Sequence, residues 1–359
     1  MKKYVPRFTS VSLLILTLSL LVYVACINYT FAADFVNSTV SVSVRFLLAK
    51  MSVLLPFSLF EALIIFLPLI LVLLILLLVR HGKGARERVR TVMALLGVIS
   101  LVFTSYIYTL GVGYYTTSLD EKIGLEATAD ISKEELLYTV DRVLTEINAI
   151  APSLTPDGGQ TRLSYSIDEL SARLVEAYDA MLSEHPILTN YSSRVKPVYF
   201  STVMSDLQIT GIYSFFTGEA NVNVEYPDYC LVFTSAHEMA HQRGVSRENE
   251  ANFVAFLVAI SSDDDYLRYA GYLNLFEYLA SALYSLEPEL YYDAYARLHS
   301  TALSDVRAAM AVYNEHKDSW LGEMNEKLND AYLKANGTEG IVTYGYVVRL
   351  AVAYYKDGR

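Results

Sequence analysis

Cysteine is nearly absent from this chain of 359 residues, which contains only Cys26 and Cys230. Cys26 lies in an apolar N-terminal run, and Cys230 is alone in the acidic part that follows Gly113. No disulfide can therefore form within the acidic part. Its stability must come from a packed core, which about 245 residues are ample to build.

Positive charge is scarce in the same part of the sequence. Residues 1–113 hold ten Lys or Arg and three Asp or Glu, a net charge of +7, whereas residues 114–359 hold 18 and 36, a net charge of −18. The acidic part has no basic patch of the kind that nucleic acid requires, so we expect no nucleic-acid partner. The chain also has no phosphate-binding Gly-rich loop, no internal repeat and no low-complexity tract.

Apolar residues are abundant, and they gather in three long runs at residues 11–29, 53–79 and 91–113. A bilayer core of about 30 Å needs about 20 apolar residues in a helix, and each run has that length. The sequence predicts a three-helix transmembrane anchor over residues 1–113. The stretch before Ala33 also resembles a signal-peptide cleavage site, so the first run is either a span or a cleaved signal peptide.

Basic residues orient the predicted spans. They cluster at Lys2, Lys3 and Arg7, and again in the short loop of residues 80–90. Short loops rich in Lys and Arg stay in the cytoplasm. An odd number of spans then places residues 114–359 outside, as one extracytoplasmic domain of a multi-pass membrane protein, and the lipid bilayer is a partner of the chain.

Two capping boxes open the outer domain. Ser132 and Glu135, and then Ser166 and Glu169, stand at the spacing of an N-cap and the third helical residue, and each pair precedes an amphipathic run. After Val195 the residues become β-branched and aromatic, which predicts short strands. The runs VKPVYFSTVM and ANVNVEY are the candidate strands; Pro227 then breaks the pattern, and YCLVF follows it.

Helices are expected in the rest of the outer domain, at residues 248–260, 265–286, about 289–317 and 344–355. The fold class that we predict is therefore membrane-anchored and mainly α with a small β-sheet: three transmembrane helices followed by an α+β domain over residues 114–359.

The stretch FTSAHEMAHQRGVSRENEANF contains H-E-x-x-H at His237, Glu238 and His241. On a helix, residues four apart share a face, so both imidazoles can bind one zinc ion. Glu238 stands beside them, where its carboxylate can take a proton from a water on the metal. We expect Thr234 to cap this helix and Gly244 to end it.

A third ligand is expected on the next helix, which Ser246 can cap. Glu248 and Glu250 are two residues apart, so they point about 200° away from each other and cannot both face the metal. We favour Glu248, because Asn252 lies one turn further on the same face and can hold the outer N–H of a ligand histidine.

The same segment resembles known proteins. H-E-x-x-H followed by E-x-x-A-N is similar to the gluzincin zinc metallopeptidases, although Asn252 stands where Asp is usual. More narrowly, residues 196–253 resemble the bacterial membrane family called domain of unknown function 3810. The resemblance implies a zincin-like domain on a bacterial cell membrane. It implies Zn²⁺ bound by His237, His241 and Glu248, with Glu238 as general base.

The leading hypothesis is a membrane-anchored zinc metallopeptidase that cleaves peptide or protein substrates outside the membrane. The alternative is a catalytically silent zinc-binding sensor or scaffold, although Glu238 favours the enzyme. Residues 221–225 are either an edge strand that pairs with an extended substrate or an ordinary internal strand, and the sequence supports both equally. A transporter is disfavoured, because the spans carry too few polar residues to line a pathway.

The orientation of the chain can be tested with tags. A protease site inserted in the loop of residues 80–90 should be protected in intact cells, whereas a tag following Arg359 should be cleaved by external protease. The opposite pattern of protection would contradict the charge argument.

Overall fold

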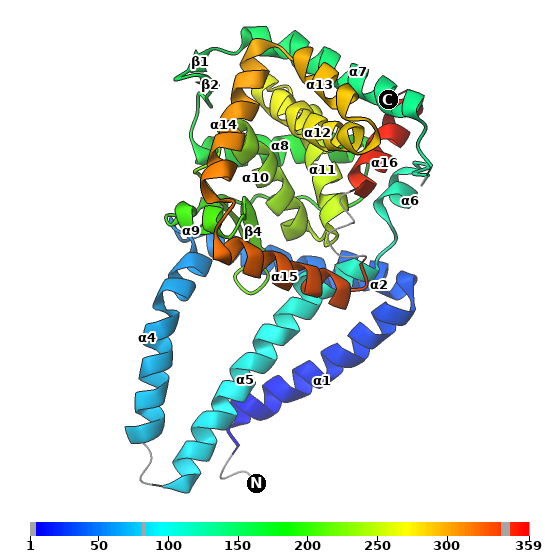
Figure 1. Cartoon of the computed structure of the whole chain (residues 1–359). Coiled ribbons are helices and arrows are strands. Elements are labelled where there is room, and N and C mark those ends of the chain that lie inside the picture. Colours follow the sequence, from blue (N-terminus) through cyan, green and yellow to red (C-terminus); the bar gives the residue numbers. More distant parts are fainter. Residues whose placement is uncertain (1–4, 81–83, 129, 339–344, 359) are drawn as a thin grey trace. The chain divides into compact units, whose positions relative to one another are not determined.

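The computed structural model describes residues 5–80, 84–128, 130–338 and 345–358. The structure is mainly helical, with a small sheet. It divides into two compact units. Unit 1 comprises Met1–Thr116 and Ser214–Glu219, and unit 2 comprises Thr117–Tyr213 and Ala220–Arg359 (Figure 1). The division differs from the expected boundary after residue 113 mainly because unit 1 includes a second, distant segment.

Unit 1 consists of apolar helices. Its elements are α1 (Arg7–Asn28), α2 (Thr30–Val36), the π-helical turn η1 (Asn37–Ser41), α3 (Val42–Val53), α4 (Leu59–Arg80), α5 (Ala85–Thr109) and the 3-10 turn η2 (Gly111–Tyr115). Part of the loop between α4 and α5, residues 81–83, lies outside the described residues. Four helices among those described are long and apolar enough to cross a membrane: Arg7–Asn28, Thr30–Val53, Leu59–Leu76 and Ala85–Tyr115.

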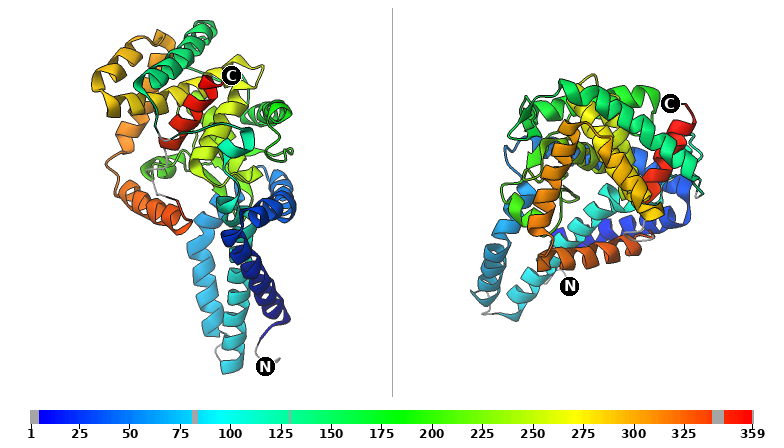
Figure 2. Two further views of the ribbon diagram at one scale, coloured as in Figure 1. Left: turned by 90° about the vertical axis from the view of Figure 1, so that its right-hand side faces the viewer. Right: turned by 45° about the horizontal axis from the view of Figure 1, so that its top comes forward.

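The stretch Thr30–Val53, formed by α2, η1 and α3, was not among the three apolar helices expected from the sequence. Its mean hydropathy is 1.2, lower than that of the other three candidates. Within unit 1 it runs across one end of α1, α4 and α5, which extend away from it (Figures 1 and 2). The buried Arg45 fixes it there, because its guanidinium donates to the Asn37 side chain and to the Tyr108 carbonyl.

The segment Ser214–Glu219 belongs to unit 1 through its hydrogen bonds. The buried Glu219 carboxylate accepts from the backbone N–H groups of Leu59 (3.0 Å) and Phe60 (2.8 Å), which lie in the first turn of α4. Such N–H groups have no partner inside the helix, so a carboxylate is favourable there. The hydroxyls of Ser105 and Thr109 donate to the Phe215 carbonyl at 2.7 and 3.0 Å.

Unit 2 contains the remaining elements (Figure 2). Its helices are α6 (Leu119–Ile123), α7 (Lys133–Ile150), η3 (Ala151–Ser153), α8 (Ile167–Glu184), α9 (Ser201–Asp206), α10 (Asp228–Arg243), α11 (Glu248–Ile260), α12 (Asp265–Leu286), α13 (Pro288–Ala296), α14 (Ser300–His316), α15 (Trp320–Ala335) and α16 (Gly345–Lys356). Its strands are β1 (Pro156–Asp157), β2 (Gln160–Thr161), β3 (Val195–Pro197), β4 (Gly211–Ser214) and β5 (Glu219–Val222), the last two of which share residues with unit 1.

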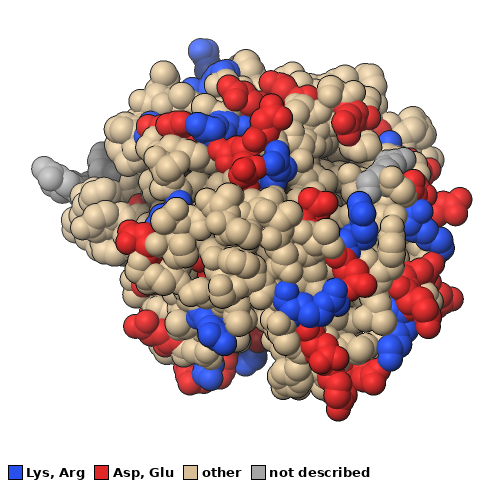
Figure 3. Space-filling view, turned by 90° about the horizontal axis from the view of Figure 1, so that it is seen from above, with Lys and Arg blue, Asp and Glu red and all other residues tan. Residues whose placement is uncertain are grey.

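The core of unit 2 forms where α10, α11 and α12 pack on one another, with α7, α8 and α16 around them. Nearly every residue of α11 is buried, which explains why its sequence is apolar on all sides rather than on one stripe. The expected capping box of Ser132 and Glu135 is present at α7, and Ser166 accepts from the Glu169 N–H at α8. On the face drawn in Figure 3, basic and acidic side chains of the described residues are intermixed around an uncharged area.

Two expectations about helices were wrong. Helix α10 begins at Asp228 after Pro227 and includes the run YCLVF, so Thr234 lies inside the helix and does not cap it. The expected helix at 289–317 is two helices, because Asn148 binds the chain between α13 and α14 through the Arg297 carbonyl and the His299 N–H. Helix α15 was not expected.

The small sheet has the strand order β3-β5-β4. Strands β3 and β5 are parallel, with Val195 opposite Ala220 and Pro197 opposite Val222. Because β5 is central, the chain around residue 221 is an internal strand, which settles the alternative that the sequence left open. Strand β4 lies at one edge of the sheet, and helix α10 packs against its face, where a Cβ at Gly211 would meet Thr234 and Glu238.

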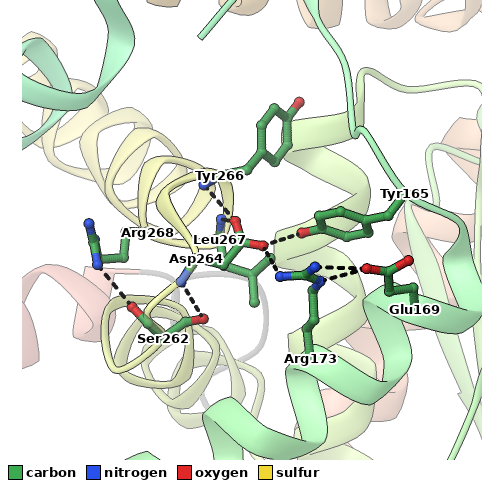
Figure 4. Close-up of polar contacts among 8 residues, drawn as sticks. All are labelled: Tyr165, Glu169, Arg173, Ser262, Asp264, Tyr266, Leu267 and Arg268. Carbon is green, nitrogen blue, oxygen red and sulfur yellow. Dashed lines mark hydrogen bonds and ion pairs between the residues drawn. The ribbon is translucent and has the colours of Figure 1, made fainter. Parts of the chain in front are cut away.

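Asp264 connects two helices of this core (Figure 4). Its carboxylate accepts from the N–H groups of Tyr266 and Leu267 at the start of α12, and also from Tyr165 (2.9 Å) and Arg173 (3.0 Å). Arg173 lies on α8, and its guanidinium stacks on the Tyr165 ring, 4.4 Å from the ring centre. One N-cap therefore also holds α8 against α12.

Close packing between α11 and α12 depends on Gly271. A Cβ added there would lie 2.6 Å from the Ala259 Cβ, nearer than two carbon atoms can approach. We expect Gly271→Ala to lower the free energy of unfolding of the full chain by about 1–3 kcal/mol, the usual cost of overpacking. Thermal unfolding followed by circular dichroism measures it.

The matched control is Gly345→Ala, since a Cβ at Gly345 meets nothing within 4 Å. Helix propensity alone favours alanine by about 1 kcal/mol in a helix interior such as position 271, and by less at position 345, the first residue of α16. If the two variants were equally stable, helices α11 and α12 would accept the added Cβ with no loss in the free energy of unfolding.

Candidate metal centre

Helix α10 presents His237, Glu238 and His241 in the middle of unit 2. The helix ends at Gly244, whose φ of 102° lies in the left-handed region that favours glycine. The Val245 N–H then donates back to the Ala240 carbonyl, and the chain turns directly into α11. This reversal confirms the expected role of Gly244. The N-cap of α11 is Arg247, without a side-chain cap, so Ser246 does not cap it.

The last turn of α10 is anchored on the side away from the histidines. Arg243 is buried between the rings of Tyr178 and Tyr191, 4.3 and 5.2 Å from their centres. Its guanidinium donates to the Asn190 side chain (2.7 Å) and to the Tyr191 carbonyl (2.9 Å). A positive charge is favourable at the C-terminal end of a helix dipole, so the burial of this arginine fixes α10 rather than straining it.

Glu248, in the first turn of α11, completes a triangle with the two histidines. The Nε2 atoms of His237 and His241 are 3.0 Å apart, and Oε2 of Glu248 is 3.2 Å from the first and 3.5 Å from the second. These three donor atoms could hold one metal ion. The Glu248 side chain keeps 24% of its surface exposed, so the triangle is open to solvent on its carboxylate side.

The orientation of His241 is fixed by a backbone group. Its Nδ1 lies 2.7 Å from the Val245 carbonyl, an acceptor, so in the neutral ring the proton is on Nδ1 and the Nε2 lone pair points into the triangle. The sequence assigned such a role to Asn252, but this histidine already has its partner in Val245. Asn252 is buried on α11. Among the described residues, no group accepts a hydrogen bond from the buried Nδ1 of His237.

The two histidines and Glu248 shift the pKa values of one another. Burial alone lowers the pKa of His241, but the Glu248 carboxylate outweighs it and raises the pKa to about 9. Burial alone raises the pKa of Glu248, yet His241 and His237 hold it well below its usual range. Each group is therefore stabilised in its charged form by the other. A divalent cation would supply the same positive charge beside the carboxylate.

Glu238 lies beside the triangle and beneath strand β4. Its carboxylate accepts from the Tyr213 N–H, and a Cβ added at Gly211 would lie 2.6 Å from its Oε1. Burial raises the pKa of Glu238 to about 7. Its Oε2 is buried, and no described residue donates a hydrogen bond to it. Glycine at position 211 is what lets the strand approach so closely.

Glu250 has a different role from Glu248. Its Oε1 accepts from the Leu119 N–H (3.0 Å), the first residue of α6, and from the Arg247 guanidinium (2.7 Å). It is buried and points away from the histidines, as expected for two residues about 200° apart around one helix. The geometry agrees with the sequence-based preference for Glu248 in the triangle.

Sequence reasoning missed the two backbone contributions to the site, the Val245 carbonyl and strand β4. A backbone acceptor has no sequence signature. The stretch GIYS of β4 is too short to show alternation, although Gly211 before an apolar pair is a signal of close backbone approach.

A family model described as "Protein of unknown function (DUF3810)" matches residues 37–352, which is most of the chain. The chain belongs to this family. The resemblance of its sequence to DUF3810 is thus confirmed, whereas the likeness to gluzincins stays a hypothesis. No curated protein and no solved structure matched this member of the DUF3810 family.

The two neighbouring carboxylates give a direct test of the triangle. Glu248→Ala should weaken zinc binding by the full-length protein at least about 100-fold, because it removes one of three donors. Glu250→Ala should keep the metal but lower the unfolding temperature, since Leu119 and Arg247 lose a buried acceptor. Metal content by mass spectrometry and thermal unfolding measure both effects. The reverse outcome, with metal lost only from Glu250→Ala, would remove Glu248 from the site.

Proposed function

We propose that this protein is a membrane-anchored zinc metallopeptidase that hydrolyses peptide bonds outside the cytoplasmic membrane. The observation that carries the proposal is the triangle of His237, His241 and Glu248 with Glu238 beside it. Two imidazoles and one carboxylate, with a fourth position left open, are the donor set of catalytic rather than structural zinc sites.

The spacing of the donor atoms supports zinc. Donors about 2.0–2.1 Å from a tetrahedral zinc ion lie about 3.4 Å from one another. The three distances in the triangle, 3.0, 3.2 and 3.5 Å, are near that value. The tautomer of His241 further supports it, because the Val245 carbonyl holds the proton of the neutral imidazole on Nδ1, so that Nε2 is the atom that would bind a metal ion.

The chemistry divides between the ion and the protein. Zinc, when bound, would polarise the scissile carbonyl and lower the pKa of a water molecule. Glu238 accepts a proton from the attacking water at its Oε2 and then gives it to the leaving amine. Strand β4 and the buried wall of α10 exclude bulk solvent around this carboxylate and hold it in one orientation.

Strand β4 is the proposed guide for an extended substrate. It is one of the two edge strands of the sheet, and the one that passes Glu238 at Tyr213. A peptide laid along it would gain main-chain hydrogen bonds, which give affinity without demanding a particular sequence. The role proposed from sequence for residues 221–225 therefore passes to β4.

The proposed location outside the membrane rests on an odd number of crossings. Helices α1, α4 and α5 are the proposed spans. The stretch Thr30–Val53 contains Asp34, Arg45 and Lys50 and is the least apolar of the four candidates. Charges are costly in the bilayer core, so this stretch is placed along the surface. A fourth crossing would put the metal triangle in the cytoplasm.

A silent zinc-binding scaffold remains the second candidate function. The coverage of Glu238 by β4 favours it, since only 4% of this residue is exposed. A site that only holds an ion has no need to admit a substrate. Catalysis requires β4 to move aside or to present the substrate at its edge.

The decisive variant is Glu238→Gln in the full-length protein. It should retain zinc and its unfolding temperature but lose at least about 100-fold in hydrolysis of a peptide library, because an amide cannot take the proton. Glu287→Gln, a change to an exposed carboxylate paired with Lys133, is the matched control and should cleave at the parent rate. Cleavage by the Glu238→Gln protein at the parent rate would contradict the assignment. A zinc-loaded parent that cleaves no peptide would favour the scaffold.

A further inference from the structure

Helix α15 carries an apolar stripe that unit 2 does not cover. Trp320, Met324 and Leu328 are spaced four residues apart and lie on one face, and they are 71%, 42% and 61% exposed. The helix is nonetheless held in place by its other face. There Gly322 lies against the Gln208 side chain, and Asn325 donates to the Leu207 carbonyl at 3.0 Å.

The segment around α9 extends the uncovered apolar area. Helix α9 packs beside α15, and the two lie along one end of unit 2 (Figure 1). Tyr199, Phe200 and Val203 are large apolar residues at the start of α9, and all three are exposed, Tyr199 by 85%. We call these three residues, together with Trp320, Met324 and Leu328, the α9–α15 surface.

We propose that the α9–α15 surface is inserted in the interfacial layer of the membrane that unit 1 spans. The residue types point to a lipid occupant: tryptophan and tyrosine are enriched at the level of the headgroups, and leucine, methionine and phenylalanine reach the upper acyl chains. A face of this kind left in water would be an aggregation hazard.

The connection between the two units makes the bilayer available to this surface. The chain passes between the two units at three points, after Thr116, after Tyr213 and after Glu219, so unit 2 is tethered to the membrane helices by more than one connection. A bilayer around unit 1 is then always close to unit 2, so an apolar surface on unit 2 meets lipid at a high effective concentration. A second copy of the chain has no such advantage at low density in the membrane.

The charges on α15 indicate how the surface would bind. The helix carries Glu323, Glu326 and Asp330 against Lys327 and Lys334, a slight excess of negative charge. Attraction to anionic lipids is therefore not the driving force. Insertion depends on the apolar side chains, and it should occur with zwitterionic lipid and persist at high salt.

Trp320 is the only tryptophan in the chain, so its fluorescence reports on this surface alone. The full-length protein is placed, one chain per disc, in phosphatidylcholine nanodiscs with or without bromine atoms on the upper acyl chain. We expect brominated lipid to lower the Trp320 emission about twofold or more, at low and at high salt, as expected for an interfacial side chain.

Two variants make the measurement specific. Trp320→Phe combined with Tyr292→Trp moves the probe to an exposed position on α13, at the other end of unit 2, and its emission should be unchanged by brominated lipid. Met324→Asp combined with Leu328→Asp alters only exposed side chains, and it should abolish the quenching of Trp320.

Three results would overturn the proposal. If Trp320 emission were insensitive to brominated lipid and had the wavelength typical of a side chain in water, the α9–α15 surface would be exposed to solvent. Equal quenching of the probes at positions 320 and 292 would show unspecific collision with lipid. Emission that becomes protected only when discs hold two chains would assign the surface to a second copy. None of these results bears on the metal triangle.

Discussion

The metal triangle depends on one backbone constraint, the left-handed conformation of Gly244. Because φ at this residue is 102°, helix α10 ends at Arg243, two residues after His241, and the next helix begins at Glu248, four residues after Gly244. The same reversal brings the Val245 carbonyl back to His241 and carries Glu248 to the two Nε2 atoms. A side chain at position 244 would strain this turn, and it would disturb the histidine tautomer and the third donor together.

Unit 2 surrounds this turn with groups that leave it little freedom. Arg243 fixes the last turn of α10 from one side, and strand β4 covers Glu238 from the other. The two carboxylates of α11 lie on opposite faces of the helix and have different roles. Glu248 supplies charge to the histidines, whereas Glu250 holds Arg247 and the start of α6. Preorganisation of this kind lowers the cost of binding an ion, because the donors are already in place.

The sequence predicted the parts of this arrangement that depend on local chemistry. The bounds of α11 and α12, the cap at Ser132 and the stop at Gly244 all follow from residues close to one another in the chain. The 100° turn per residue showed that Glu248 and Glu250 cannot both face the histidines, whereas the choice of Glu248 rested on Asn252, although the partner of His241 is the Val245 carbonyl. What could not be predicted was long-range: the pairing of β4, the Val245 acceptor and the burial of α10 on all sides.

The hydrogen bonds of Ser214–Glu219 limit where the chain can be cut without loss of structure. The turn between β4 and β5 belongs to unit 1, where Glu219 caps α4 and Phe215 binds α5. A single cut after Thr116 would therefore strip a buried carboxylate of its donors only a few residues from the strand that covers Glu238. The two units are not independent modules that recombination could exchange between chains, and a gene fragment beginning at position 117 would encode an incomplete fold.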